Sequence, residues 1–192
     1  MKYLLCLLVV IVSLTQSGTS IPVAGQSPCN CRAGEPNKEV NRLQTVIRDE
    51  SARTSDPERV FKAIEQLGDL KAVEAVDELT KLLSFKREIK DEDVGGIVTE
   101  YRRYPAVAAL YKIGECSLPA LVRVIENEPG NSIESKNAYF TMLILDRENS
   151  ANSAKCLRGA ARKAATREGF ERLIKAAEKL EAHRRKVQPP PN

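Results

Sequence analysis

Two stretches of the chain decide its fold: AIEQLGDLKAVEAVDELTKLL at residues 63–83 and AALYKIGECSLPALVRVIENE at residues 108–128. They align about 45 residues apart. With one residue less in the second turn, Gly68 matches Gly114 and Val76 matches Leu121. Each stretch carries apolar residues at helical spacing on both sides of a glycine-containing turn. A helix–turn–helix unit at this period indicates helix pairs that stack on one another.

Helix signals continue on both sides of this repeat. Asp56-Pro57 is a helix start, with the aspartate as cap and the proline in the first turn. Gly68-Asp69 and Gly114 are expected to end the helices that precede them. Residues 84–98 contain a charge run and Gly95-Gly96, and we expect a long connection there. The pattern predicts about eight helices and no strand, over residues 40–47, 57–67, 73–83, 99–113, 118–127, 133–146, 154–165 and 168–185.

The two stretches resemble HEAT repeats, through Leu67-Gly68-Asp69 followed by Ala72-Val73 and through Ile113-Gly114-Glu115 followed by Leu118-Pro119-Ala120-Leu121. The resemblance covers roughly residues 57–180. It implies an all-α fold, a short right-handed α–α solenoid of about seven to eight helices with flexible termini. A third helix pair, 133–146 with 154–165, departs from the pattern because it lacks the turn glycine.

The ends of the chain carry no helix-pair pattern. Residues 1–20 combine a positive start, an apolar stretch and a small polar exit, the three parts of a secretory signal peptide. The apolar stretch, Tyr3 to Leu14, is shorter than the roughly 20 residues of a membrane-spanning helix. We therefore expect a secreted or periplasmic protein with no stable membrane insertion. The expected organisation is a signal peptide at 1–20, an extended lead-in at 21–37, the HEAT-like domain at 38–186 and a Pro-rich tail at 187–192.

Signal cleavage would remove Cys6 and leave Cys29, Cys31, Cys116 and Cys156. An even number of cysteines in an exported chain favours disulfides, and four cysteines allow three connectivities. We expect Cys116 to pair with Cys156, since a bond between Cys29 and Cys31 would close a very tight loop. The alternative is that Cys116 and Cys156 are small buried hydrophobic residues.

Composition excludes several classes of function. A net charge of +4 among 56 charged residues does not indicate a nucleic-acid binder. The single histidine, His183, excludes a zinc site built on two imidazoles, and we expect its side chain to be exposed. We expect no metal and no cofactor.

By resemblance to HEAT repeats, the second helices of the units line one face that binds a protein partner, without catalysis. A second candidate binding region follows the long connection, where tyrosine and arginine, residues typical of binding hot spots, are adjacent. For both regions the alternative is that the side chains have no binding role, and are either solvated or packed against the rest of the fold. The candidate binding residues are Glu74, Asp77, Glu78, Arg123, Arg158 and Arg162 on the face, and Tyr101, Arg102, Arg103 and Tyr104 after the connection.

Two other functions remain open from the sequence. Asp91, Glu92, Asp93 and Glu100 could supply the paired carboxylates of a hydrolase or lyase that acts on an extracellular polymer. The basic residues around His183 could instead bind a polyanion or an envelope surface. Convergence of the carboxylates in a cleft would distinguish the enzyme from a scaffold.

Overall fold

The computed structural model describes residues 37–89, 103–149 and 152–187. Within these ranges all regular secondary structure is helical and no strand occurs, which confirms the all-α class. The expected signal peptide, the lead-in up to residue 36 and residues 188–192 of the tail lie outside the described residues. The α-helices are α1 Lys38–Arg48, α2 Glu50–Ser55, α3 Pro57–Asp69, α4 Val76–Thr80, α6 Pro105–Ile113, α7 Leu118–Asn127, α8 Ile133–Asn149, α9 Ser153–Ala161 and α10 Arg167–Val187, with 3-10 turns η1 Val73–Ala75 and η3 Gly114–Ser117.

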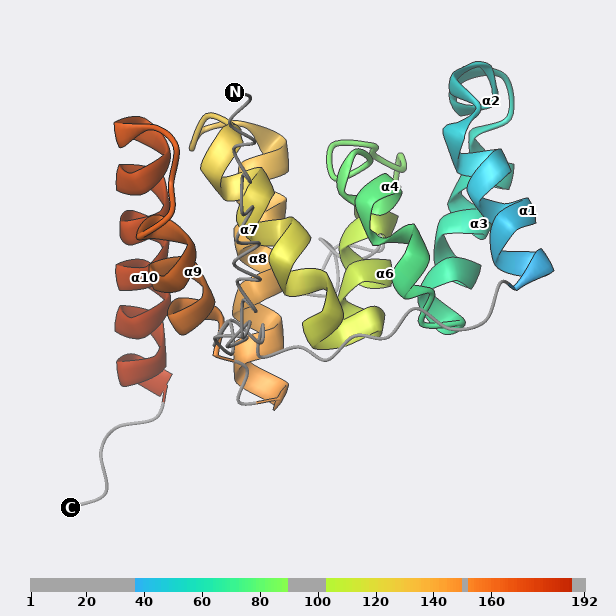
Figure 1. The fold of residues 1–192 in the computed structure, drawn as a ribbon. Helices are drawn as coiled ribbons and strands as arrows, with labels where there is room; N and C mark the ends of the chain where they lie inside the picture. Colours follow the sequence, from blue (N-terminus) through green and yellow to red (C-terminus); the bar gives the residue numbers. More distant parts are fainter. Residues whose placement is uncertain (1–36, 90–102, 150–151, 188–192) are drawn as a thin grey trace, which may run out of the picture.

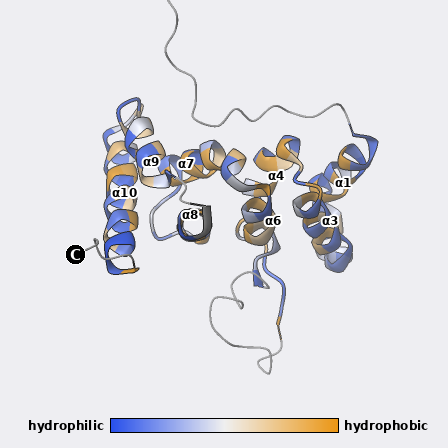
Figure 2. Cartoon of the chain, turned by 90° about the horizontal axis from the view of Figure 1, so that it is seen from below, coloured by the Kyte–Doolittle hydropathy of each residue, from blue (hydrophilic) through white to orange (hydrophobic). Residues whose placement is uncertain are grey.

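The helices lie side by side in chain order, from α1 at one end of the molecule to α10 at the other (Figure 1). Seen from below they form two layers, with α3, α6 and α8 in one and α4, α7 and α9 in the other (Figure 2). Contacts run along each layer, from α3 to α6 to α8 and from α4 to α7 to α9. The last helix, α10, packs on α9 and α7.

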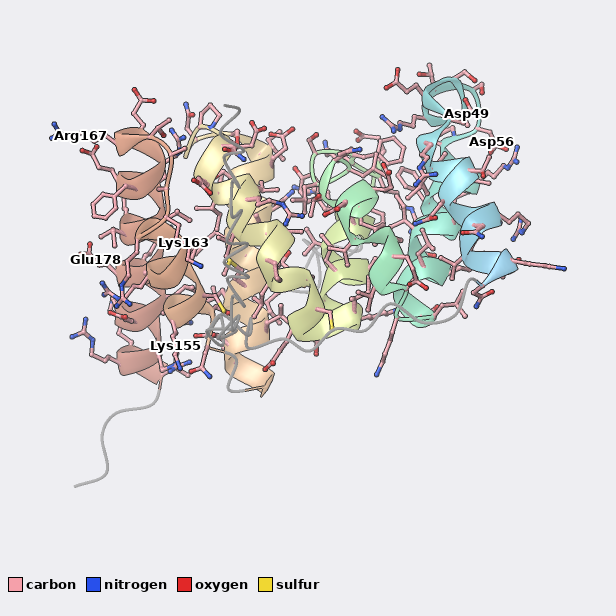
Figure 3. The ribbon with its side chains drawn as sticks, viewed as in Figure 1. Asp49, Asp56, Lys155, Lys163, Arg167 and Glu178 are labelled. Carbon is pink, nitrogen blue, oxygen red and sulfur yellow. The ribbon has the colours of Figure 1, made fainter. Side chains whose placement is uncertain are left out.

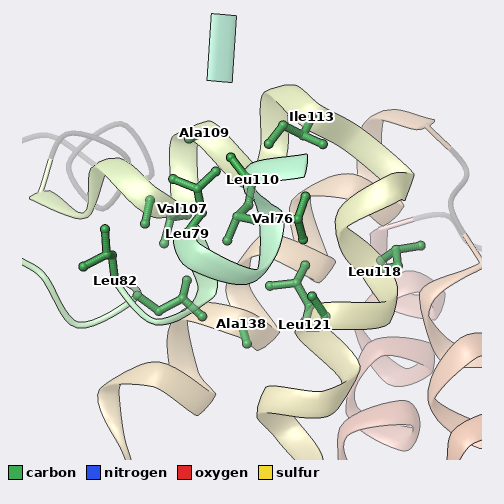
Figure 4. Packing of buried hydrophobic residues seen from close by; sticks show 14 of the residues in the cluster. Val76, Leu79, Leu82, Val107, Ala109, Leu110, Ile113, Leu118, Leu121 and Ala138 are labelled. Carbon is green, nitrogen blue, oxygen red and sulfur yellow. The ribbon is translucent and has the colours of Figure 1, made fainter. Parts of the chain in front are cut away.

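One hydrophobic core runs between the two layers. The residues of this core form a single contact cluster that includes members of α1, of α10 and of the helices between them. Leu79 of α4 and Leu121 of α7 have no exposed surface, and both belong to this cluster together with Leu110 of α6 (Figure 4). Because each helix pair alone would leave this apolar surface in water, packing against the neighbouring pair supplies most of its burial.

Local sequence signals explain where several helices begin. Asn37 caps α1 by accepting a hydrogen bond from the backbone N–H of Glu39. Asp56 caps α3 through the N–H of Arg59, with Pro57 in the first turn as expected. Each cap satisfies a backbone donor that the helix itself leaves open.

The two glycines aligned in the sequence have different structural roles. Gly114 ends α6 with a positive φ of 84°, as expected of a helix-terminating glycine. Gly68 lies inside the last turn of α3, which ends one residue later at Asp69, within the expected Gly68-Asp69 terminator. A Cβ atom at Gly68 would lie 2.7 Å from Cα of Ala109, so this glycine allows α3 to approach α6 closely.

Several expected boundaries also differ from the structure. The helix expected at 99–113 begins at Pro105, and Tyr104 before it is extended, as proline disfavours the helical conformation in the preceding residue. The helix expected at 73–83 is reduced to η1 and the five residues of α4. The short helix α2 has a cap at Asp49 that the apolar pattern did not reveal. None of the described helices is long and apolar enough to cross a membrane.

Candidate binding surface

Two of the three acidic residues expected on the binding face, Asp77 and Glu78, form ion pairs within the molecule. An oxygen of Asp77 lies 2.5 Å from Arg123 of the next helix pair. Glu78 lies 3.1 Å from Arg48 of α1 and 3.1 Å from Lys81. These hydrogen bonds hold the pKa of Glu78 below its usual value, with the bond to Lys81 as the largest cause. The charges of this face therefore neutralise one another between neighbouring helices.

Other polar contacts also join neighbouring helix pairs at a similar sequence separation. Lys112 of α6 lies 2.5 Å from Asp69 of α3. The guanidinium of Arg172 in α10 donates to the backbone carbonyl of Glu126 near the C-terminal end of α7, where helix carbonyls lack partners. Such contacts fix one helix pair relative to the next, although each exposed ion pair stabilises the fold only slightly.

Arg158 and Arg162, expected together on the third helix pair, have different surroundings. Arg158 donates two hydrogen bonds to Glu181 of α10, at 2.9 and 2.8 Å, so it joins α9 to α10. This contact lowers the pKa of the Glu181 carboxyl. Arg162 is exposed and makes no ion pair with a described residue, and the same holds for the Glu74 carboxylate.

The second candidate region is only partly described. Tyr101 and Arg102 lie outside the described residues. Arg103 is half-buried, and its carbonyl accepts a hydrogen bond from the N–H of Arg87. Tyr104 is half-buried against the core. This position agrees with the alternative in which the tyrosine packs within the fold. Next to them, the guanidinium of Arg87 lies 4.6 Å from the centre of the Phe61 ring and donates to Glu65.

The expected disulfide between Cys116 and Cys156 is wrong. Cys116 is disulfide-bonded, but its bond does not include Cys156. Cys116 lies in η3, which packs on α6 and α7, while Cys156 lies in α9, which packs mainly on α10, α7 and α8. Cys29 and Cys31 lie outside the described residues.

Asp91, Glu92, Asp93 and Glu100, the candidate catalytic carboxylates, lie outside the described residues. Among the described residues no group of three or more His, Cys, Asp or Glu side chains could hold a metal ion. His183 is half-buried where exposure was expected, and it lines a small hollow between α8 and α10 with Asp146 and Arg184.

The net charge is concentrated in the last two helices. Residues 152–187 contain eleven Lys and Arg but four Asp and Glu, a net charge of +7. Residues 37–89 contain ten basic and eleven acidic residues, and residues 103–149 contain five and six. This asymmetry is present in the sequence, but the net charge of the whole chain, +4, conceals it.

Most of the acidic side chains at this end of the molecule are neutralised by ion pairs. Glu168, Glu171 and Glu181 each pair with an arginine, which leaves Glu178 as the one acidic residue of 152–187 without an ion pair to a described residue. Seven cations of the same region are exposed and make no ion pair with the part of the chain that the structure describes. One of them, Lys179, lies over the ring of Tyr139. We call the other six the basic surface: Lys155, Arg162, Lys163, Lys175, Arg185 and Lys186.

The basic surface covers the outer sides of two adjacent antiparallel helices. Figure 3 shows Lys155 and Lys163 on the α9 side and Glu178 on the side of α10 turned away from α9. Phe170 of α10 is 44% exposed. Glu178 of α10 is exposed as well, whereas Ile174 between the two is half-buried against the core.

Comparison with known proteins gives no relative: no family model, no curated protein and no solved structure matches the chain.

Proposed function

We propose that the protein is an exported, HEAT-like right-handed α–α solenoid that binds another protein and catalyses no reaction. The binding face is the outer side of the layer that contains α4, α7 and α9. The observation that carries this proposal is the side-by-side packing of these three helices in chain order, which produces one extended surface. Stacked helix pairs commonly present such surfaces to macromolecular partners.

The ion pairs on this layer support a role as a rigid scaffold. Arg48, Glu78, Asp77 and Arg123 connect α1, α4 and α7 across their boundaries. A surface that is already ordered loses less conformational entropy when a partner binds. The face can therefore offer a fixed shape instead of one that forms only on binding.

A photo-crosslinking experiment tests the binding face. A photoreactive amino acid replaces Glu74 or Arg162, which are exposed on the proposed face, or Lys62 or Lys136, which are exposed on α3 and α8 of the other layer. Each variant is exposed to the extracellular fraction of the cells that produce the protein. We expect one protein to crosslink from Glu74 and Arg162, and to bind the unmodified chain when it is purified separately. Equal crosslinking from both layers, or none from the face, would contradict the proposal.

A further inference from the structure

We propose that the basic surface of α9 and α10 is a docking site for a protein segment rich in Asp and Glu. This inference rests on the proposed function, because it names the chemistry of the partner. It is carried by the segregation of charge: the six cations of the basic surface, with Lys179 over the Tyr139 ring, face one carboxylate without an ion pair. These groups lie on α9, α10 and the turn between them, in a chain whose remaining described parts are nearly neutral.

The spacing of these cations fits an extended anionic segment and not a small anion. Lys155 and Arg162 are seven residues apart, about 10 Å along the helix, and Lys175 and Arg185 are ten residues apart, about 15 Å. A phosphate or sulfate ion would require donors that converge within hydrogen-bond distance. Acidic side chains distributed along a peptide can reach each cation separately.

The neighbours of the cations favour a protein over a uniformly charged polymer. Phe170 is exposed on α10, and aromatic side chains are enriched at protein interfaces. Glu178 is exposed on the same helix, where it would repel a sulfated chain or an anionic lipid surface but could accept a hydrogen bond from a protein. The apolar side of α10, with Leu173, Ala177 and Leu180, is buried in the core and so is not available to a membrane.

The absence of stacking groups argues against nucleic acid as the partner. Single-stranded nucleic acids are bound by aromatic side chains on which bases stack. Phe170 is the one exposed aromatic side chain in the described part of α9 and α10, and the ring of Tyr139 nearby is covered by Lys179, whose amine lies 4.5 Å from the ring centre. The basic surface thus has the charge for polyanion binding without a stacking platform.

Charge reversal tests this site. The triple variant K155E/R162E/K163E changes three residues of the basic surface, and the matched control K38E/K62E/K136E makes the same change in net charge at exposed lysines of α1, α3 and α8. The probe is a fluorescent peptide of glutamate with regularly spaced leucines, titrated by anisotropy at low and at physiological ionic strength. We expect the first variant to weaken binding about tenfold or more and the control to change it little, because screening limits distant charges.

Two further probes separate the possible partners. A heparin fragment represents a sulfated polymer, and vesicles of phosphatidylserine represent an anionic membrane. We expect the Glu/Leu peptide to bind more tightly than either, and F170S to weaken binding of the peptide but not of heparin. Tighter binding of heparin or vesicles, or equal effects of the two triple variants, would overturn the inference. If the partner found by crosslinking binds K155E/R162E/K163E normally, the scaffold proposal stands and the docking site is wrong.

Discussion

At the scale of single residues, the same amino acid in aligned positions can have different physical roles. Gly114 supplies a positive φ that ends α6, which the sequence predicts from its place after an apolar stripe. Gly68 supplies the absence of a side chain where α3 meets α6. A single sequence does not distinguish these roles, because a helix end and a close helix crossing both favour glycine.

The role of Gly68 predicts the effect of a methyl group there. In Gly68→Ala the new Cβ would lie 2.7 Å from Cα and 3.0 Å from Cβ of Ala109, and since these atoms belong to a helix, α3 and α6 must separate. We expect a loss of about 1–3 kcal/mol in the free energy of unfolding. In the control Gly159→Ala nothing lies within 4 Å, and we expect a gain of up to about 1 kcal/mol from helix propensity. Urea denaturation measures both, and a stabilised Gly68→Ala would exclude the close contact.

At the scale of secondary-structure elements, helix starts are better predicted than helix lengths. Asp56-Pro57 and Leu118-Pro119 each mark a start that the structure places within one residue, because capping and proline geometry act locally. The short α4 was overestimated because the apolar stripe continues through Leu82 and Leu83, which are buried in a turn after the helix has ended. Burial depends on neighbouring helices, so apolar spacing alone does not fix where a helix stops.

The contact between α9 and α10 predicts a dependence on pH. The Arg158 hydrogen bonds lower the pKa of the Glu181 carboxyl in the folded protein, relative to an ordinary value of about 4.3. A lowered folded pKa contributes stability above the unfolded value, and this contribution is lost as the pH falls through the folded pKa. We expect Glu181→Gln to be less stable than the wild type at neutral pH and the difference to vanish in acid. Because both side chains are 40% exposed, the difference is small and decreases with added salt.

Chemical denaturation at neutral pH and at pH values below about 4 measures this difference between Glu181→Gln and the wild type. Glu178→Gln is the control, since Glu178 lies one helical turn away on α10 and forms no ion pair with a described residue. A Glu178→Gln variant that loses as much stability as Glu181→Gln would show that the general charge of α10, and not this contact, is responsible.

At the scale of the whole molecule, the sequence predicted the fold class more fully than the binding surface. The repeat of two similar stretches and the helix start and stop signals predict an all-α chain, because both depend only on the local spacing of residues. The pairing of Asp77 with Arg123 and of Arg158 with Glu181 was not predicted, since these partners are 46 and 23 residues apart. Helical spacing indicates which charged side chains point outward. It does not indicate which of them remain without an ion pair, because that depends on which helices become neighbours. The residues of the basic surface could therefore be selected only after the helices were placed.

The continuous core predicts that helices far apart in the sequence unfold together. Leu79 and Leu121 belong to one cluster that extends from α1 to α10, and neither has exposed surface. Replacement of either by Ala removes packing between α4, α6 and α7, and we expect it to cost about 2–5 kcal/mol. The exposed Leu70→Ala is the control, because Leu70 is 46% exposed and the expected change is within about 0.5 kcal/mol.

The cooperativity of the variants is as informative as their stability. If the helix pairs depend on one another, Leu79→Ala should lower the unfolding midpoint of the whole chain. Circular dichroism follows all helices, and the fluorescence of a probe attached near α10 follows that end of the molecule. Coincident transitions are the expected result. Separate transitions, with α9 and α10 remaining folded after α4 has melted, would mean that the helix pairs are independent units. The basic surface would then have its own stability, and charge reversal could be interpreted without reference to the rest of the fold.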